Sequence, residues 1–223
     1  MNKELIRQAF IKLIAGFVLM GLLIFLPAGS LKYAKGWLLM LVLFVPMLLA
    51  GLLMLKYDPE LLRKRLNAKE TEGEQKKVIG FSGLMFIACF VIAGLNYRFK
   101  WLEMPDTASW IACGIFLLGY GMFGEVLREN SYLSRTIEVQ SGQKVIDTGL
   151  YGIVRHPMYS ATIFMFLAMP LILGSPWSFI IMLAYLPLIH ARMVNEEKVL
   201  AEGLPGYSEY LKKVKWRVIP YLW

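Results

Sequence analysis

The chain has 223 residues, of which 57% are hydrophobic, and its mean hydropathy is +0.55. A soluble domain of this size could not bury so many apolar side chains, so the composition excludes an ordinary soluble protein and indicates an integral membrane protein. The formal net charge is +8, but the basic residues follow the connecting segments and form no basic module, which argues against nucleic acid as a partner.

Four long apolar segments come first, each close to the roughly 20 residues with which a helix crosses a bilayer. They cover residues 10–26, 36–57, 78–97 and 110–127. Two shorter apolar stretches, 158–173 and 177–189, follow, and the Gly-Ser-Pro sequence between them favours a helical hairpin. We therefore expect an all-α integral membrane protein with about six transmembrane helices, of which the last two form a short hairpin, and an amphipathic C-terminal helix.

The basic residues predict the orientation of these helices. If six helices alternate in direction, 20 of the 24 Lys and Arg residues lie on the side of the N-terminus, and the other side holds Lys32, Lys35, Arg98 and Lys100. The positive-inside rule then places both termini in the cytoplasm, with the protein in a cytoplasmic membrane of prokaryotic type. The charged start of the first helix is similar to that of a signal peptide, but its apolar run is longer, so we expect it to be retained.

The character of the chain changes near Glu125, after which polar residues become dense. We interpret residues 1–128 as a scaffold of four helices and residues 129–223 as the functional half of one structural domain. Cys89 and Cys113 lie inside apolar segments without the spacing of metal ligands, so we expect reduced core residues and no metal site. Residues 136–146 are expected to form a short hairpin or an extended cover, and Pro187 is expected to kink the last helix.

The segment 149–159 places polar groups at the start of an apolar helix. Pro157 fixes its own φ and disfavours helical geometry in the residue before it, so His156 should end an extended loop and Pro157 should begin a helix. Arg155, His156 and the N–H groups of the first turn would then form a positive mouth, suited to an anionic or carboxylate-bearing ligand. This segment is the first candidate for a binding site.

The end of the fourth predicted helix and the C-terminal tail carry further charges. Glu125 and Glu129 share a helical face beside Arg128, and a charge cluster that ends the helix is favoured over a pocket wall. The tail, residues 206–220, mixes aromatic and basic residues, which suits a helix on the membrane surface or a lid over a site.

The last predicted helix ends in a second group of charges. Arg192 and Glu196 lie on one face, whereas His190 lies roughly opposite and points in the same direction as Glu197. An ordinary ion pair on the surface of a helix and a functional pair both explain Arg192 with Glu196.

These blocks, in this order, resemble the isoprenylcysteine carboxyl methyltransferase family of integral membrane enzymes, which is related to the phospholipid methyltransferases. The resemblance covers about residues 129–220. It consists of a Gly-x-Tyr-x-x-x-Arg-His-Pro-x-Tyr block at 149–159, an Arg with two Glu residues at 192, 196 and 197, a Tyr-x-x-Tyr segment at 207–210 and an Arg-x-x-Pro ending at 217–220. Each element alone is a weak signal, whereas the ordered set is specific.

The resemblance implies methyl transfer from S-adenosylmethionine, held in a cytoplasm-facing pocket, to a lipidic acceptor that enters from the bilayer. It makes residues 129–223 the cofactor-binding and catalytic half, with Arg192 and Glu196 as catalytic residues and Arg192 as the holder of an acceptor carboxylate. The implied cofactor-binding residues are Gln143, Val145, Ile146, Tyr151, His156, Pro157, Met158, Tyr159 and Glu196. Gln143 departs from the pattern, because the eukaryotic prenylcysteine enzymes have a His there.

The chemistry agrees with this interpretation. Methyl transfer is an in-line displacement that requires orientation and exclusion of water but no metal. A carboxylate acceptor is already ionised and an Arg can orient it, whereas an amine would need a general base such as Glu196, Glu197 or Glu125. An acid acceptor is therefore favoured over phospholipid N-methylation. A membrane reductase that uses NADPH, and a transporter or assembly factor with Glu125 and His190 on a pathway, remain alternatives.

Overall fold

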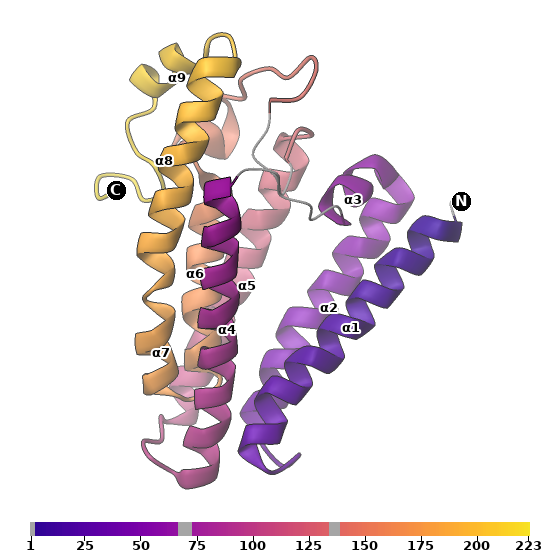
Figure 1. Cartoon of the computed structure of the whole chain (residues 1–223), viewed down its shortest axis with the longest axis vertical. Coiled ribbons are helices and arrows are strands. Elements are labelled where there is room, and N and C mark those ends of the chain that lie inside the picture. Colours follow the sequence, from indigo (N-terminus) through magenta and orange to yellow (C-terminus); the bar gives the residue numbers. More distant parts are fainter. Residues whose placement is uncertain (1–2, 67–72, 134–138) are drawn as a thin grey trace.

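The computed structural model of the chain describes residues 3–66, 73–133 and 139–223. Figure 1 shows helices joined by loops, and these residues contain no β-strand. The N-terminal elements are α1 (Lys3–Ala28), α2 (Ala34–Tyr57), α3 (Pro59–Leu66), α4 (Gly73–Phe99) and α5 (Asp106–Glu129). The C-terminal elements are the 3₁₀ turn η1 (Gly149–Gly152), α6 (Pro157–Ile172), α7 (Pro176–Met182), α8 (Tyr185–Gly203) and α9 (Tyr207–Lys213).

The prediction of an all-α membrane protein is confirmed. Within the described residues, five helical segments are long and apolar enough to cross a membrane: Lys3–Ala28, Ala34–Tyr57, Val78–Phe99, Asp106–Glu129 and Pro176–Gly203. The remaining apolar helix, α6, has only 16 residues and is therefore about 24 Å long. It pairs with α7 and α8 as the predicted hairpin, but the second arm is not short, because α8 continues 14 residues beyond the apolar stretch that ends at Ile189.

The last span is interrupted between α7 and α8, at Leu183 and Ala184. Pro187 lacks the N–H that would bond the carbonyl of Leu183, and its ring crowds that carbonyl. The backbone therefore tightens, and the N–H of Leu186 donates to the carbonyl of Leu183 at 3.1 Å. The kink that Pro187 predicts is confirmed, and it lies one turn before the proline.

The helices form two groups. In Figure 1, α4 to α8 stand side by side as a bundle, whereas α1 and α2 form a pair that is inclined to it. The closest packing joins α5 to α6. It depends on Gly119, because a Cβ there would lie 2.7 Å from Cγ of Met165 and 3.0 Å from the carbonyl oxygen of Ala161. The two helices that flank the functional site are thus held in close contact.

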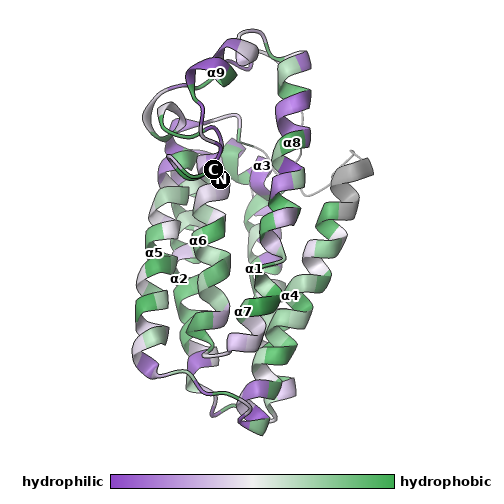
Figure 2. Ribbon diagram, turned by 90° about the vertical axis from the view of Figure 1, so that its left-hand side faces the viewer, coloured by the Kyte–Doolittle hydropathy of each residue, from purple (hydrophilic) through white to green (hydrophobic). Residues whose placement is uncertain are grey.

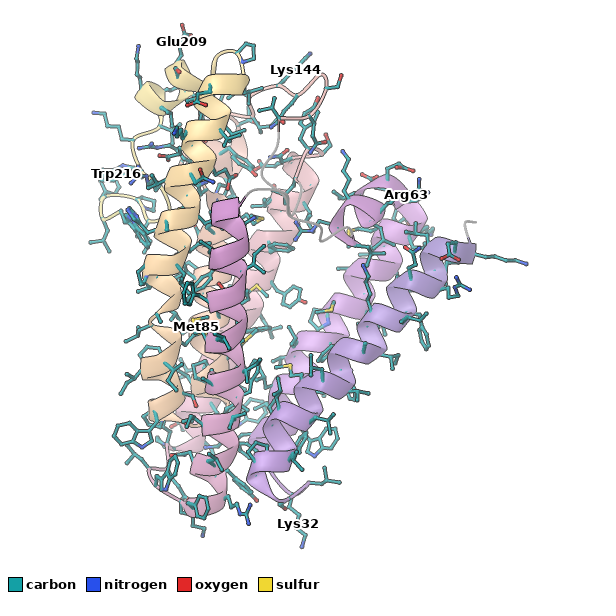
Figure 3. All side chains as sticks on the ribbon, in the orientation of Figure 1. Lys32, Arg63, Met85, Lys144, Glu209 and Trp216 are labelled. Atoms are coloured by element: carbon teal, nitrogen blue, oxygen red, sulfur yellow. The ribbon has the colours of Figure 1, made fainter. Side chains whose placement is uncertain are left out.

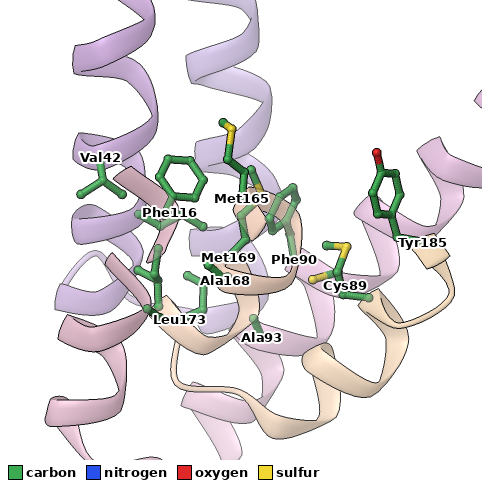
Figure 4. Packing of buried hydrophobic residues seen from close by; sticks show 14 of the residues in the cluster. Val42, Cys89, Phe90, Ala93, Phe116, Met165, Ala168, Met169, Leu173 and Tyr185 are labelled. Atoms are coloured by element: carbon green, nitrogen blue, oxygen red, sulfur yellow. The ribbon is translucent and has the colours of Figure 1, made fainter. Parts of the chain in front are cut away.

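The core of the bundle is apolar and tightly filled. Figure 4 shows Phe116, Met165, Met169 and Leu173 packed between the helices, with Cys89 and Tyr185 nearby. Cys89 and Cys113 are free and buried, as expected of core residues. Many apolar side chains point outward instead, including Leu26 and Leu118, which are 73% and 72% exposed. Lipid is the solvent for such a surface.

The polar residues collect at the two ends of the helices. Figure 2 shows hydrophobic colouring along the helix shafts and hydrophilic colouring at the upper end of α8, at α9 and at α3. Figure 3 places Arg63, Lys144 and Glu209 at this upper end and Lys32 at the opposite end. The candidate site lies at the upper end, beside α9.

Candidate active site

The loop before α6 is anchored to the end of α5 by a carboxylate. Gly149 has a φ of +50°, and a Cβ added there would lie 1.3 Å from Oε1 of Glu129. The other carboxylate oxygen, Oε2, accepts the N–H of Leu150 at 3.1 Å. Only glycine leaves room for this carboxylate, so Glu129 and Gly149 together determine where η1 begins.

The neighbouring charges on α5 have a different environment. Arg128 and Glu125 form an ion pair at 2.5 Å, and their side chains are 73% and 40% exposed. The prediction of a charge cluster that ends the helix is confirmed for this pair. Such an exposed pair contributes little to stability.

Tyr151 connects η1 to both α5 and α9. Its side chain packs against Val126 and Leu133, and its hydroxyl accepts a hydrogen bond from Nδ2 of Asn130 at 2.9 Å. Burial raises the pKa of Tyr151 to about 12, and the bond from Asn130 only partly offsets this. The phenol is therefore neutral and can donate its proton to a ligand. The carbonyl of Tyr151 accepts the hydroxyl of Tyr210 at 2.8 Å.

The Arg-His-Pro segment has the predicted backbone. His156 has φ −126° and ψ 62°, which is not helical, and Pro157 is the first residue of α6. The N–H groups of Arg155 and His156 donate to the carbonyls of Trp216 and Arg217 at 2.9 and 2.8 Å. The C-terminal tail therefore runs alongside this loop and accepts from its backbone N–H groups.

The predicted positive mouth is wrong in one respect, because a carboxylate of the chain itself fills it. Glu197, whose side chain is only 9% exposed, accepts from Nη1 of Arg155 at 3.0 Å and from Nη2 of Arg217 at 2.9 Å. It also lies 3.1 Å from Nε2 of His156. These basic groups bind an internal anion and are not free for an external one.

Glu197 is the main residue that the sequence analysis placed incorrectly. Helical geometry turned it away from Arg192, as expected, but its partners come from the loop and the tail and not from His190. The ring of His190 instead stacks on Trp223, with centroids 5.9 Å apart. The only sequence signal for the role of Glu197 was its place in the pair of Glu residues.

A tyrosine joins the two predicted catalytic residues. The hydroxyl of Tyr159, on α6, donates to Oε2 of Glu196 at 2.5 Å and accepts from Nε of Arg192 at 3.0 Å. Tyr159 is buried. The pair on α8 is therefore more than a surface ion pair, because both side chains are oriented by a buried hydroxyl from another helix.

The helix α9 covers the site with aromatic side chains. Tyr207 and Tyr210 are buried and pack with Val145, Leu200 and Leu204. Burial raises the pKa of both tyrosines above the usual range. The predicted amphipathic C-terminal helix is only seven residues long. Its apolar face contacts the protein. Of the two predicted roles for the tail, the lid describes this packing better than the surface anchor.

The segment before η1 forms the remaining wall. Among its described residues, 139–146, there is a turn at Ser141 and Gly142 but no strand, and the other residues of the predicted hairpin lie outside the described part. Oε1 of Gln143 accepts the N–H of Gln140 at 2.8 Å. Lys64 of α3 donates to Oε1 of Gln140 at 3.0 Å. Gln143 therefore stabilises the turn as well as lining the site.

These elements surround a cavity that is open to solvent on one side. Nine of the predicted site residues line it: Gln143, Val145, Ile146, Tyr151, His156, Met158, Tyr159, Arg192 and Glu196. Pro157 does not line it and is buried at the start of α6. The roles of these residues in binding and catalysis remain predictions.

Several other residues of the lining were not predicted, among them Lys144, Leu200 and Leu204. Leu200 continues the four-residue spacing of Arg192 and Glu196 along α8, so helical periodicity could have identified it, whereas Leu204 follows the end of the helix. Within the described residues, no group of three or more His, Cys, Asp or Glu side chains is placed to bind a metal ion.

Comparison with known proteins bears on the same part of the chain. The family model for phospholipid methyltransferases matches residues 107–205. The matched region runs from α5 to just beyond α8 and contains every predicted site residue, but not the tail with Tyr207, Tyr210 and Arg217.

Two curated relatives are named as sterol reductases and not as methyltransferases. The Delta(14)-sterol reductase TM7SF2 of Mus musculus is 27% identical over 128 residues, which cover 51% of this chain and 30% of the mouse protein. The Delta(14)-sterol reductase of Arabidopsis thaliana is 26% identical over 155 residues, which cover 64% of this chain and 42% of the plant protein. The chain thus spans less than half the length of either relative.

Proposed function

We propose that the chain is a membrane methyltransferase that transfers the methyl group of S-adenosylmethionine to the carboxylate of a lipidic acceptor. The observation that carries the proposal is that nine of the predicted site residues line one cavity beside a membrane-spanning bundle. The match to the phospholipid methyltransferase model over the same helices supports the reaction class.

The cavity suits the chemical groups of this donor. S-adenosylmethionine combines an aromatic base, hydroxyl groups, a sulfonium cation and an amino acid moiety that carries an ammonium and a carboxylate. Val145, Leu200 and Leu204 supply an apolar wall for the base, and the carboxylate of Glu196 can accept from hydroxyl or ammonium groups. When bound, the donor supplies an electrophilic methyl carbon.

The remaining tasks of catalysis are orientation and exclusion of water. Tyr159 fixes the orientation of both Glu196 and Arg192 by hydrogen bonds. The guanidinium of Arg192 can hold an acceptor carboxylate, which is ionised at neutral pH and needs no general base. Tyr207 and Tyr210 of α9 close one side of the cavity and limit the access of water.

The orientation in the membrane is part of the proposal. The cavity lies at the end of the bundle that carries Arg63 and Lys144 (Figure 3). We assign this end to the cytoplasm, because 20 of the 24 basic residues belong to the segments on this side. The donor would then enter from the cytosol and the lipidic acceptor from the bilayer. The same arrangement would serve a phospholipid amine, with Glu196 as the base.

A reductase that uses NADPH is a second candidate, because both curated relatives are named sterol reductases. NADPH carries several phosphate charges, which proteins bind with helix N-termini and unpaired cations. The cations in the described lining are Lys144, Arg155 and Arg192, and Arg155 is already paired with Glu197. This shortage of free positive charge favours the methyl donor.

The decisive experiment measures binding of radiolabelled S-adenosylmethionine to the purified full chain in lipid nanodiscs, with unlabelled S-adenosylmethionine or NADPH as competitor. We expect competition by the former only, and weaker binding in Glu196→Gln and His156→Ala. Glu202→Gln is the matched control, since Glu202 is an exposed residue of the same helix. Displacement of the label by NADPH, or equal binding in all variants, would contradict the proposal.

The acceptor is identified by incubation with labelled donor and a membrane extract. Release of the label from the lipid by mild base indicates a methyl ester, and resistance to base indicates an N-methyl group. A base-resistant product would show that the acceptor is an amine and not a carboxylate.

A further inference from the structure

The environment of Glu197 bears on what the cavity binds. Its carboxylate accepts from Nη1 of Arg155, from Nε and Nη2 of Arg217, and contacts Nε2 of His156. Arg155 and Arg217 remain charged at any ordinary pH and can only donate. Glu197 is therefore an ionised acceptor on all sides.

This arrangement selects the tautomer of His156 in the neutral form of its ring. In a neutral imidazole one ring nitrogen carries the proton and the other accepts. Because the carboxylate of Glu197 can only accept, the proton of the neutral ring lies on Nε2, and Nδ1 carries the lone pair.

The second ring nitrogen, Nδ1, has no hydrogen bond to a described residue. His156 lines the cavity, and its ring stacks on Tyr159 with centroids 5.5 Å apart and an angle of 28° between the planes. The hydrogen bonds of the side chain to described residues go through Nε2 alone. Nδ1 is thus the ring nitrogen that these hydrogen bonds leave available, and Tyr159 and Glu197 together fix the ring.

We propose that Glu197 is a positioning residue that presents Nδ1 of His156 to the cavity as a hydrogen-bond acceptor, so that the ligand group bound there is a donor: a protonated amine or a hydroxyl. The inference rests on the proposed function in one respect, since S-adenosylmethionine carries both groups. The sequence analysis expected Arg155 and His156 to bind an anionic ligand. The proposal differs, because the carboxylate of Glu197 already contacts both side chains.

Nuclear magnetic resonance of ring nitrogens tests the proton position directly. The chain has two histidines, so protein labelled with ¹⁵N-histidine gives two sets of ring signals, and His190→Gln identifies those of His156. We expect the ligand-free protein to show a protonated Nε2 and an unprotonated Nδ1. Addition of S-adenosylhomocysteine should shift the Nδ1 signal of His156 and leave the ring signals of His190 unchanged.

Glu197→Leu should release the tautomer. Oε1 of Glu197 contacts Nε2 and also accepts from Arg155, so glutamine would keep an oxygen at this place, whereas leucine removes every acceptor. The proton is then no longer held on Nε2 and can move to Nδ1, where it prevents acceptance, so the affinity for S-adenosylhomocysteine should fall about tenfold or more. Arg217→Gln is the matched control, because it removes one partner of Glu197 but leaves the carboxylate on Nε2, and the tautomer should be retained.

The outcomes separate this inference from the proposed function. A proton on Nδ1 of the neutral ring in the unmodified protein, or the same tautomer in Glu197→Leu, would overturn the role of Glu197. A reversed tautomer with unchanged affinity would overturn the assignment of a donor group at Nδ1. If S-adenosylhomocysteine does not bind at all, the proposed function fails, while the spectra of the ligand-free protein still decide the role of Glu197.

Discussion

Replacement of Gly149 by alanine tests how the loop of the site is held. The substitution introduces two separate costs. A non-glycine residue at a φ of +50° is strained, and the new Cβ would overlap the carboxylate of Glu129, whose Oε1 lies 1.3 Å from the Cβ position. Gly142 offers a matched control, because it has a φ of +72° and no heavy atom lies within 4 Å of its Cβ position.

The two costs differ in size. The left-handed backbone costs about 1–2 kcal/mol for alanine and applies to both glycines. Displacement of Glu129 also breaks its bond to the N–H of Leu150, and a hydrogen bond to a charged group contributes about 1.5–3 kcal/mol. We therefore expect Gly149→Ala to lower the free energy of unfolding by about 2.5–5 kcal/mol and Gly142→Ala by only the first part.

Thermal unfolding in detergent, followed by circular dichroism, measures the difference. For a chain of this length the midpoint should fall by roughly 10 °C in Gly149→Ala and roughly 4 °C in Gly142→Ala. In a Glu129→Ala background the overlap is absent, so Gly149→Ala should then cost no more than Gly142→Ala. Equal shifts for the two glycine variants in the parent protein would refute the argument.

Three further predictions concern single contacts. Tyr159→Phe removes the hydroxyl between Glu196 and Arg192 and should lower kcat/KM at least tenfold, measured as methyl transfer; an unaffected rate would show that the hydroxyl orients neither residue. Lys64→Met removes the bond that holds the turn of Gln143 through Gln140 and should weaken donor binding about threefold by filter assay, whereas Arg63→Gln, at an exposed position, should not. The hydrogen bond from Lys213 holds the pKa of Asp147 below its usual range. The carboxylate therefore stabilises the fold above its unfolded-state pKa and loses this effect as the pH falls through the folded pKa. Asp147→Asn should lower the thermal midpoint slightly at neutral pH and match the parent protein in acid, and a difference that grows in acid would contradict the assignment.

The helices could be predicted because their physical cause is local. Apolar runs of sufficient length predicted the spans, and the restricted φ of proline predicted both the start of α6 at Pro157 and the interruption of the last span before Pro187. Helical periodicity also placed Arg192 and Glu196 on one face, and the structure brings both to the cavity that His156 lines. The extent of α8 was less predictable, because polar and charged residues between His190 and Lys198 interrupt its apolar run.

The sequence by itself therefore determined the membrane fold, the places where the chain turns, and most of the residues that meet at the site. The tertiary structure alone decided how the charges pair. Arg155, Glu197 and Arg217 are far apart in the chain, and a charged side chain in a buried site selects its partner by distance and geometry, which no local pattern contains. For this reason a segment that was predicted to bind an external anion contains a carboxylate of the same chain, Glu197, between its basic side chains.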